Sequence, residues 1–243
     1  MSVWDWSVFF HNLVHPAILQ GLWTTVWLTF STLVLAIALG TAVALVGRIE
    51  NVAARAFYQG YVAFFRATPL LVQLVFLYSA LPQMGVRLSV MEAAIIGLML
   101  SESPYVAEIV RSSLSAVPGA QWEAARAIGM RPATIMRAII FPQAFRIAIP
   151  PLGNEFVRQL KNTSLVSIIS MTELFRATDS LTQTNFRVLE GLAVATLYYL
   201  ALMVIWTGLQ NRLERRNSKW FAEAGKADAT EAAAAPAKVA SHA

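Results

Sequence analysis

Between two long apolar stretches, the chain reads EAARAIG from Glu123 to Gly129 and then IIFP from Ile139 to Pro142. Pro132 stands between the two runs and cannot continue a helix that begins before it. Gly129 is suited to end such a helix, because glycine readily adopts the left-handed backbone that many helix C-termini need. We therefore expect a short helix over about residues 119–131. A helix of this length is marginal alone and is ordered mainly by what it packs against.

This short helix has a narrow apolar stripe and several small residues. Trp122, Ala125 and Ile128 recur at helical spacing and predict an apolar stripe. Because Ala124, Ala125 and Gly129 are small, a partner surface can approach the backbone closely. From these residues alone, two interpretations stay open. The helix either lies on lipid headgroups or sits in a groove of a cytoplasmic partner.

Composition indicates a membrane protein. Of the 243 residues, 57% are hydrophobic and 14% are charged, and the mean hydropathy is +0.55. Soluble domains carry about 25% charged residues, and a chain of this length has too little polar surface to cover so apolar a core. With no cysteine in the chain, a disulfide framework, a cysteine-ligated zinc site and a cysteine nucleophile are excluded.

Runs without charged residues locate the membrane spans, because a helix needs roughly 20 apolar residues to cross a bilayer. Residues 1–20 are expected to form an extracytoplasmic, interfacial segment, rich in Trp and His rather than in the basic residues of a signal peptide. An Ala-rich tail from 212 to 243 is expected to be cytoplasmic and mostly disordered. The membrane domain, 21–211, is predicted to have spans over about 21–46, 61–81, 90–110, 147–171 and 191–211.

Basic residues predict the orientation of these five spans. The segments 47–57, 111–146 and 212–243 carry two, five and six Lys or Arg, whereas the segments on the other side carry at most two each. Short loops rich in Lys and Arg stay in the cytoplasm. The N-terminus is therefore predicted outside and the C-terminus inside, which places the segment that begins at Glu123 in the cytoplasm.

This segment resembles the EAA signature of permease subunits in ABC importers, EAA-x3-G-x9-I-x-LP, with Phe141 where the signature has Leu. Further blocks resemble the permeases for polar amino acids within that group. They are RATPLLVQL at 66–74, EIVR at 108–111, PQAFR at 142–146, PPLGNE at 150–155 and LKNTSL at 160–165. The resemblance covers about residues 20–215. One departure is Gly119-Ala120-Gln121, where the family usually has a sequence like Lys-Gly-Gln.

The resemblance implies an all-α integral membrane protein of the type I importer permease fold, with five transmembrane helices and a cytoplasmic coupling helix. It implies a subunit of the bacterial inner membrane that imports a polar amino acid, or a close derivative such as an opine. A second permease, identical or paralogous, cytoplasmic ATP-binding subunits and an extracytoplasmic solute-binding protein are the implied partners. Glu123, Ala124, Ala125 and Gly129 are the implied contacts to the ATPase.

No chemistry of its own is expected for this chain. It has no Gly-rich loop ending in Gly-Lys-Ser or Gly-Lys-Thr, so ATP and Mg²⁺ are expected on the partner ATPase. We expect no catalytic residues, no metal site, no cofactor and no nucleic-acid partner. The alternative function is an amino-acid carrier driven by an ion gradient, although such carriers commonly contain an internal repeat and none is visible here. An intramembrane enzyme is a weaker alternative, because His11, His15 and His242 lie outside the spans.

Ionisable residues within the spans are candidates for the substrate path, because each costs a few kcal/mol or more in a bilayer unless it is paired or wetted. Glu155 and Arg158 share a helix face, and Asn154 and Glu102 complete the candidate set. Pro150-Pro151 is expected to break or bend the backbone just before them. From the sequence, an ion pair of Glu155 with Arg158 or Lys161 that merely holds the helix explains these residues equally well.

Two further ionisable groups lie near the cytoplasmic ends of the spans. Glu108 and Arg111 have the spacing of a helical ion pair. Glu108 is also a second candidate, after Glu102, to line the path from the third span. Arg66 is expected to extend to the inner headgroups, as long basic side chains do near helix ends.

Overall fold

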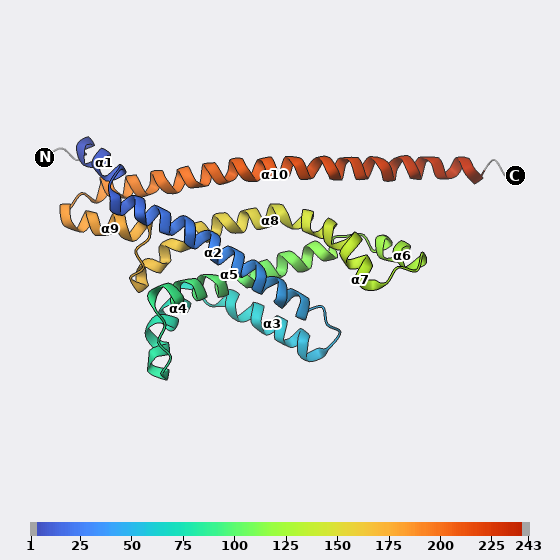
Figure 1. Ribbon diagram of the computed structural model, residues 1–243, viewed down its shortest axis with the longest axis horizontal. Coiled ribbons are helices and arrows are strands. Elements are labelled where there is room, and N and C mark those ends of the chain that lie inside the picture. Colours follow the sequence, from blue (N-terminus) through green and yellow to red (C-terminus); the bar gives the residue numbers. More distant parts are fainter. Residues whose placement is uncertain (1–3, 240–243) are drawn as a thin grey trace. The chain divides into compact units, whose positions relative to one another are not determined.

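The computed structural model describes residues 4–239, with the backbone alone for 216–239. Of these, residues 4–203 belong to one compact unit and residues 204–239 to a second, and all regular structure in the described part is helical (Figure 1). The helices are α1 (Trp6–Leu13), α2 (Pro16–Val46), α3 (Val52–Ala67), α4 (Leu70–Val75), α5 (Val90–Ser115), α6 (Gly119–Ala127), α7 (Pro132–Ile135), α8 (Phe141–Asn162), α9 (Leu174–Asn185) and α10 (Val188–Val239). Short π-helical and 3₁₀ segments link some of them, at Phe76–Ala80, Leu81–Met84, Met136–Ile140 and Thr163–Ile169.

Helices suited to crossing a membrane account for most of this chain. Four qualify by length and composition within the described residues: 16–46, 90–115, 132–169 and 188–215. The fifth is a pair, Val52–Ala67 and Leu70–Met84, bent by 97°. The expectation of one helix over 61–81 is therefore wrong. Thr68 has an extended backbone with ψ of 122°, because the residue before a proline, here Pro69, is disfavoured in the helical region.

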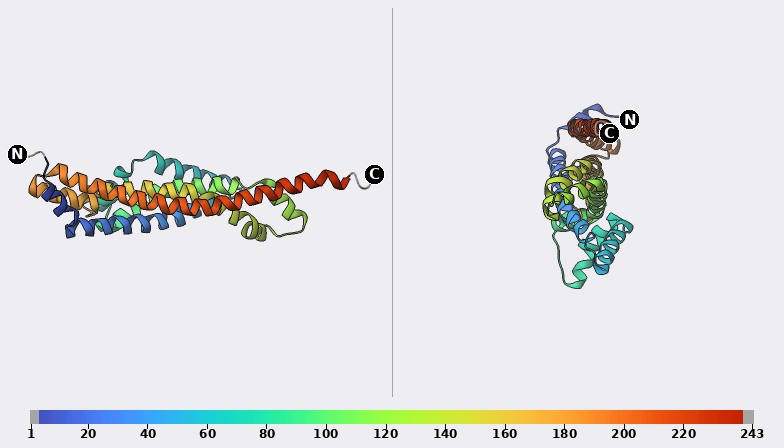
Figure 2. Two further views of the ribbon diagram at one scale, coloured as in Figure 1. Left: turned by 90° about the horizontal axis from the view of Figure 1, so that it is seen from above. Right: turned by 90° about the vertical axis from the view of Figure 1, so that its right-hand side faces the viewer.

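Helices α2, α5 and α8 run side by side and form the centre of the first unit (Figures 1 and 2). Small residues let α2 and α5 approach closely, as in other membrane helix pairs. Ala36 and Ala44 of α2 and Ala107 of α5 are fully buried. At Gly40, a Cβ would lie 2.5 Å from the carbonyl oxygen of Ser103. This contact fixes the distance between the two helices.

Local sequence explains where α5 begins and what one acid of the third span does. Ser89 and Glu92 form a capping box, in which each side chain binds the other's backbone N–H group. Glu92 therefore belongs to the helix start and not to a membrane-embedded charge cluster.

Helix α8 passes through both prolines of its interior without ending. The sequence predicted a break or a bend at Pro150-Pro151, and of these two a break is absent. Gly153 and Phe156, one turn further on, are buried, and α8 packs along α5 and α2. In this setting tertiary packing outweighs the local preference of proline against helix interiors.

Buried polar groups tie α9 to its neighbours at the end of the unit opposite α6 and α7 (Figure 1). The carboxylate of Glu173 accepts hydrogen bonds from the backbone N–H groups of Phe175 and Arg176, both at 2.8 Å, and from the hydroxyl of Tyr199 at 3.1 Å. Burial raises the pKa of Glu173, although these hydrogen bonds act in the opposite direction. The hydroxyl of Thr25 on α2 accepts a hydrogen bond from the backbone N–H of Leu174. Helices α2, α9 and the start of α10 are therefore joined here.

The two ends of the chain differ from the sequence expectation. Residues 4–20 are not a separate segment: α1 covers Trp6–Leu13, and α2 already begins at Pro16. Helix α10 continues to Val239, over residues for which the sequence predicted a mostly disordered tail. The tail is rich in alanine, which has the highest helix propensity. Residues 1–3 and 240–243 lie outside the described residues.

The close contact at Gly40 yields a prediction with an internal control. Gly40→Ala is expected to lower the stability of the purified protein by about 1–3 kcal/mol, because the added methyl group meets the carbonyl oxygen of Ser103 and the side chain of Val106. Gly60→Ala on α3, where a Cβ meets nothing within 4 Å, is expected to be neutral or stabilising by up to about 1 kcal/mol. Thermal unfolding midpoints of both variants measure this. Equal midpoints would contradict the packing described here.

Candidate functional site

Helices α5 and α8 bring three ionisable side chains together inside the helical bundle. Arg158 Nη2 lies 3.0 Å from Glu102 Oε1 and 2.5 Å from Glu155 Oε2, and Arg158 Nε donates to the same Glu155 oxygen at 2.6 Å. The side chain of Glu102 is fully buried, while that of Arg158 is 31% exposed. The sequence predicted the Glu155–Arg158 contact as one alternative. The participation of Glu102 links α5 to α8 and turns this helical pair into a three-membered cluster.

Tyr105 connects this cluster to a second ion pair. The guanidinium carbon of Arg158 lies 3.4 Å from the centre of the Tyr105 ring, and that of Arg66 lies 5.1 Å from it. Arg66 in turn forms an ion pair with Glu108 at 2.5 Å. The expected Glu108–Arg111 pair is therefore replaced by Glu108–Arg66, because α3 packs against α5 and brings Arg66 opposite Glu108. Arg66 thus has a partner within the protein.

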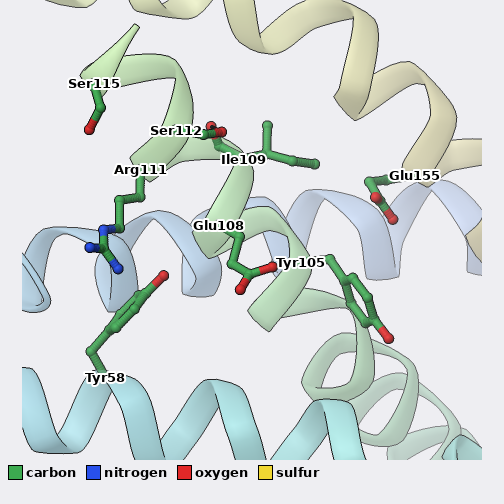
Figure 3. A pocket seen from close by; sticks show the side chains of 8 residues that line it. All are labelled: Tyr58, Tyr105, Glu108, Ile109, Arg111, Ser112, Ser115 and Glu155. Atoms are coloured by element: carbon green, nitrogen blue, oxygen red, sulfur yellow. Dashed lines mark hydrogen bonds between the residues drawn. The ribbon is translucent and has the colours of Figure 1, made fainter.

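A hollow of about 510 Å³ opens beside these groups. Figure 3 shows Arg111 and Glu155 on opposite sides of it, with Glu108 and Tyr105 between them. The lining is completed by Tyr58, Ile109, Ser112 and Ser115. Of the four residues proposed for the path, Glu155 lines the hollow, and Arg158 and Glu102 lie in its cluster. Asn154 is exposed on α8 and does not belong to this lining.

The short helix predicted from the EAA run is present as α6, over Gly119–Ala127. Gly129 has φ of 78°, which confirms the left-handed backbone predicted for it. Glu123, Ala124 and Gly129 are exposed, whereas Ala125 is 3% exposed. Three of the four proposed coupling residues are therefore accessible to a partner, and Ala125 instead faces the chain itself.

The buried side of α6 is anchored to the ends of α5 and α8. Ala125 belongs to a hydrophobic cluster with Leu114, Val117, Ile135, Ile140 and Ala144, and Trp122 and Met130 pack at its edge. The apolar stripe predicted from Trp122, Ala125 and Ile128 is thus divided: the first two pack inward, and Ile128 is 78% exposed.

Tyr105 and Tyr58 were not predicted as site residues. For Tyr105 the signal was present, because Glu102, Tyr105 and Glu108 follow one another at intervals of three residues on one face of a helix. Tyr58 gave no such signal. It lies on α3 beneath Arg111, whose guanidinium carbon is 5.3 Å from its ring centre, and only the packing of α3 on α5 reveals it.

Comparison with known protein families identifies the chain. Residues 36–219 match the family described as the inner membrane component of binding-protein-dependent transport systems. The chain belongs to this family. It is a permease subunit of an ABC transporter, which confirms the expectation from the EAA run; the family gives no support to an ion-gradient carrier.

Curated relatives match over most of their length. The probable amino-acid permease YxeN of Bacillus subtilis is 35% identical, covering 90% of this chain and 98% of its own. The L-cystine permease TcyB of the same organism is 34% identical, covering 86% and 89%. The glutamine permease GlnP of Escherichia coli K12 is 32% identical, covering 87% and 97%.

Solved structures share the fold. A crystal structure of an amino acid ABC transporter with histidines has a chain that is 34% identical, with a TM-score of 0.79, covering 83% of this permease and 94% of that chain. An inward-facing methionine transporter, MetNI, is 20% identical with a TM-score of 0.71, covering 84% and 97%, and shows the fold alone. The permease has the type I ABC importer fold predicted from its sequence.

The shared cation of the cluster predicts how this permease responds to substitution. Arg158→Gln leaves Glu102 and Glu155 facing each other without a cation, and breaking a buried pair in this way costs about 3–5 kcal/mol. We expect a lower thermal unfolding midpoint and a lower yield of the purified permease. Adding Glu102→Gln to Arg158→Gln removes one of the two acids and should restore part of the loss. Wild-type stability of Arg158→Gln would show that the cluster is not energetically coupled.

Proposed function

We propose that this permease carries a polar amino acid, or a close derivative such as an opine, into the cell. The main support for this proposal is the cluster of Glu102, Glu155 and Arg158 beside an open hollow within the membrane-spanning helices. Such groups are costly in a bilayer and mark substrate paths. They suit a substrate that carries an ammonium and a carboxylate group. The amino-acid permeases among its relatives support the same substrate class.

Several partners follow from this proposal. The permease pairs with a second permease, identical or paralogous, receives its substrate from an extracytoplasmic binding protein, and binds cytoplasmic ATPase subunits through α6. ATP and Mg²⁺ are bound and used by these ATPase subunits, and the permease itself is not catalytic. The N-terminus lies outside and the C-terminus in the cytoplasm of a bacterial inner membrane, in keeping with the distribution of basic residues.

The surface of α6 supports its role as the coupling element. Glu123, Ala124 and Ile128 are exposed on it, next to the exposed turn at Gly129. Because Ala125 fixes the opposite side to the ends of α5 and α8, a force applied to the exposed side is passed to the helices that hold the charged cluster. A bistable pair of permease subunits biased by ATP from one face and by the loaded binding protein from the other accounts for import.

Stimulation of ATP hydrolysis tests the proposed function. The permease is purified with its ATPase and binding protein, and hydrolysis is measured with each polar amino acid and with opines. We expect at least one of these compounds to raise the rate through the binding protein. A hydrolysis rate that no amino acid or opine changes would contradict the proposal.

Gly129 provides the sharper prediction for coupling. Gly129→Val places a β-branched residue at φ of 78°, which costs on the order of 1–3 kcal/mol locally, and adds bulk at the exposed turn. The spans should insert normally, while substrate-stimulated hydrolysis falls toward the basal rate or the ATPase dissociates. Glu123→Lys, which reverses an exposed charge, should act in the same direction.

Gly119→Val is the matched control for this prediction. It adds the same atoms in the same loop, where a Cβ also meets nothing within 4 Å, but Gly119 lacks the left-handed backbone. We expect it to keep most of the stimulation. Full stimulation in Gly129→Val, at normal membrane levels, would show that α6 is an interfacial helix and not the coupling element.

A further inference from the structure

The charged side chains around the hollow do not pair one to one. At one end, Glu102 and Glu155 share a single cation, Arg158. This end therefore carries one acid in excess of its bases. Two carboxyl groups beside one guanidinium have acceptor oxygens to spare, and these suit a ligand group that donates hydrogen bonds.

The opposite imbalance is found toward the cytoplasmic end of α5. Glu108 is held by Arg66, which leaves Arg111 without a carboxylate within ion-pair distance in the described part of the chain. Arg111 lines the 510 Å³ hollow and also an adjoining hollow of about 590 Å³. Arg66 and Tyr58 line this second hollow as well. Stacking over the Tyr58 ring at 5.3 Å positions the Arg111 guanidinium there.

Glu155, from the acidic end, and Arg111, from the basic end, face one cavity (Figure 3). A guanidinium is the preferred protein group for a carboxylate, because its planar fork can donate two parallel hydrogen bonds. The distance between the two ends matters for the kind of ligand. Tyr105, which stacks against Arg158, and Arg111 are six residues apart on α5, or about 9 Å along the helix axis. The ammonium and carboxylate on one α-carbon are too close together to reach both ends.

We propose that this hollow binds an elongated α-amino acid whose α-carboxylate is held by Arg111, while a cationic or hydrogen-bond-donating group at its far end faces Glu155. The proposal rests on the proposed function and adds to it the orientation and the length of the substrate. Arg111 is then a binding residue for the carboxylate that all α-amino acids share, and the Glu102–Glu155–Arg158 cluster reads the side-chain end.

The test removes the carboxylate from the ligand and the guanidinium from the protein, separately and together. Binding is measured by calorimetry on the permease–ATPase complex without binding protein, in phosphatidylcholine nanodiscs, so that no anionic headgroup competes for Arg111. The probes are L-arginine, L-glutamine and L-histidine, each compared with the amine that lacks the carboxylate: agmatine, 4-aminobutanamide and histamine.

We expect the wild-type complex to bind at least one of these amino acids ten-fold or more tightly than its amine. Arg111→Gln should weaken the binding of that amino acid by ten-fold or more and leave the affinity for the amine within about two-fold. The substitution and the loss of the ligand's carboxylate remove the same contact, so their effects should not add. Arg111→Lys, which keeps the charge and loses the fork, should recover part of the affinity. Arg137→Gln removes an exposed arginine that does not line this hollow, and it should leave the affinity for both ligands unchanged.

Three outcomes would overturn the proposal. Arg111→Gln could leave amino-acid binding unchanged, or weaken amino acid and amine equally, which would indicate a structural role. The wild-type complex could also bind none of the amino acids although the binding protein delivers one that stimulates hydrolysis; the proposed function would then stand without this site. If no amino acid stimulates hydrolysis either, the proposed function fails, and the present proposal with it. Should Arg111→Gln not assemble, the ratio of amino-acid to amine affinity in Arg111→Lys decides.

Discussion

The sharing of Arg158 by two acids is the constraint on which the middle of this permease depends. An ionised side chain within a membrane span costs a few kcal/mol or more unless it is paired. Glu102 is fully buried, and the cation beside it is Arg158, which α8 holds against α5. The close contact of α2 with α5 at Gly40, and of α8 with both, fixes the spacing at which this pairing works.

The same three helices connect the charged cluster to the end of the unit that carries α6. Helix α5 continues to Ser115, and its last turns, with the start of α8, form the apolar cluster into which Ala125 of α6 packs. Rigid helices and a packed cluster are the kind of contiguous element through which two sites can be coupled. A displacement of α6 therefore need not pass through any loop before it reaches the helices that carry Glu102 and Glu155.

Much of this arrangement could be predicted from sequence because local rules determine it. The left-handed backbone at Gly129 follows from local rules, because Pro132 prevents the short helix from continuing and glycine suits its C-terminus. The bend before Pro69 was also available from local rules, since proline restricts the residue before it, but hydropathy alone joined the two halves into one span. Periodicity within a helix indicated the contact of Glu155 with Arg158.

Contacts between helices could not be predicted in this way. Glu108 has a suitable partner three residues away in Arg111, yet packing of α3 brings Arg66 to it instead. Ala125 reads as one more small residue of a partner-facing surface, and only the fold shows that it faces inward. Helix α8 likewise keeps its two interior prolines because its neighbours support it. In each case a long-range contact overrides a preference that is visible locally.

The central claim is that this chain is the membrane subunit of an ATP-driven importer of a polar amino acid. Its most direct test is uptake into liposomes that contain the permease and its ATPase, with the binding protein and the labelled amino acid outside. The account predicts uptake that requires ATP and is unchanged when ionophores collapse the proton and sodium gradients. Uptake that continues without ATP and stops when a gradient is collapsed would contradict it.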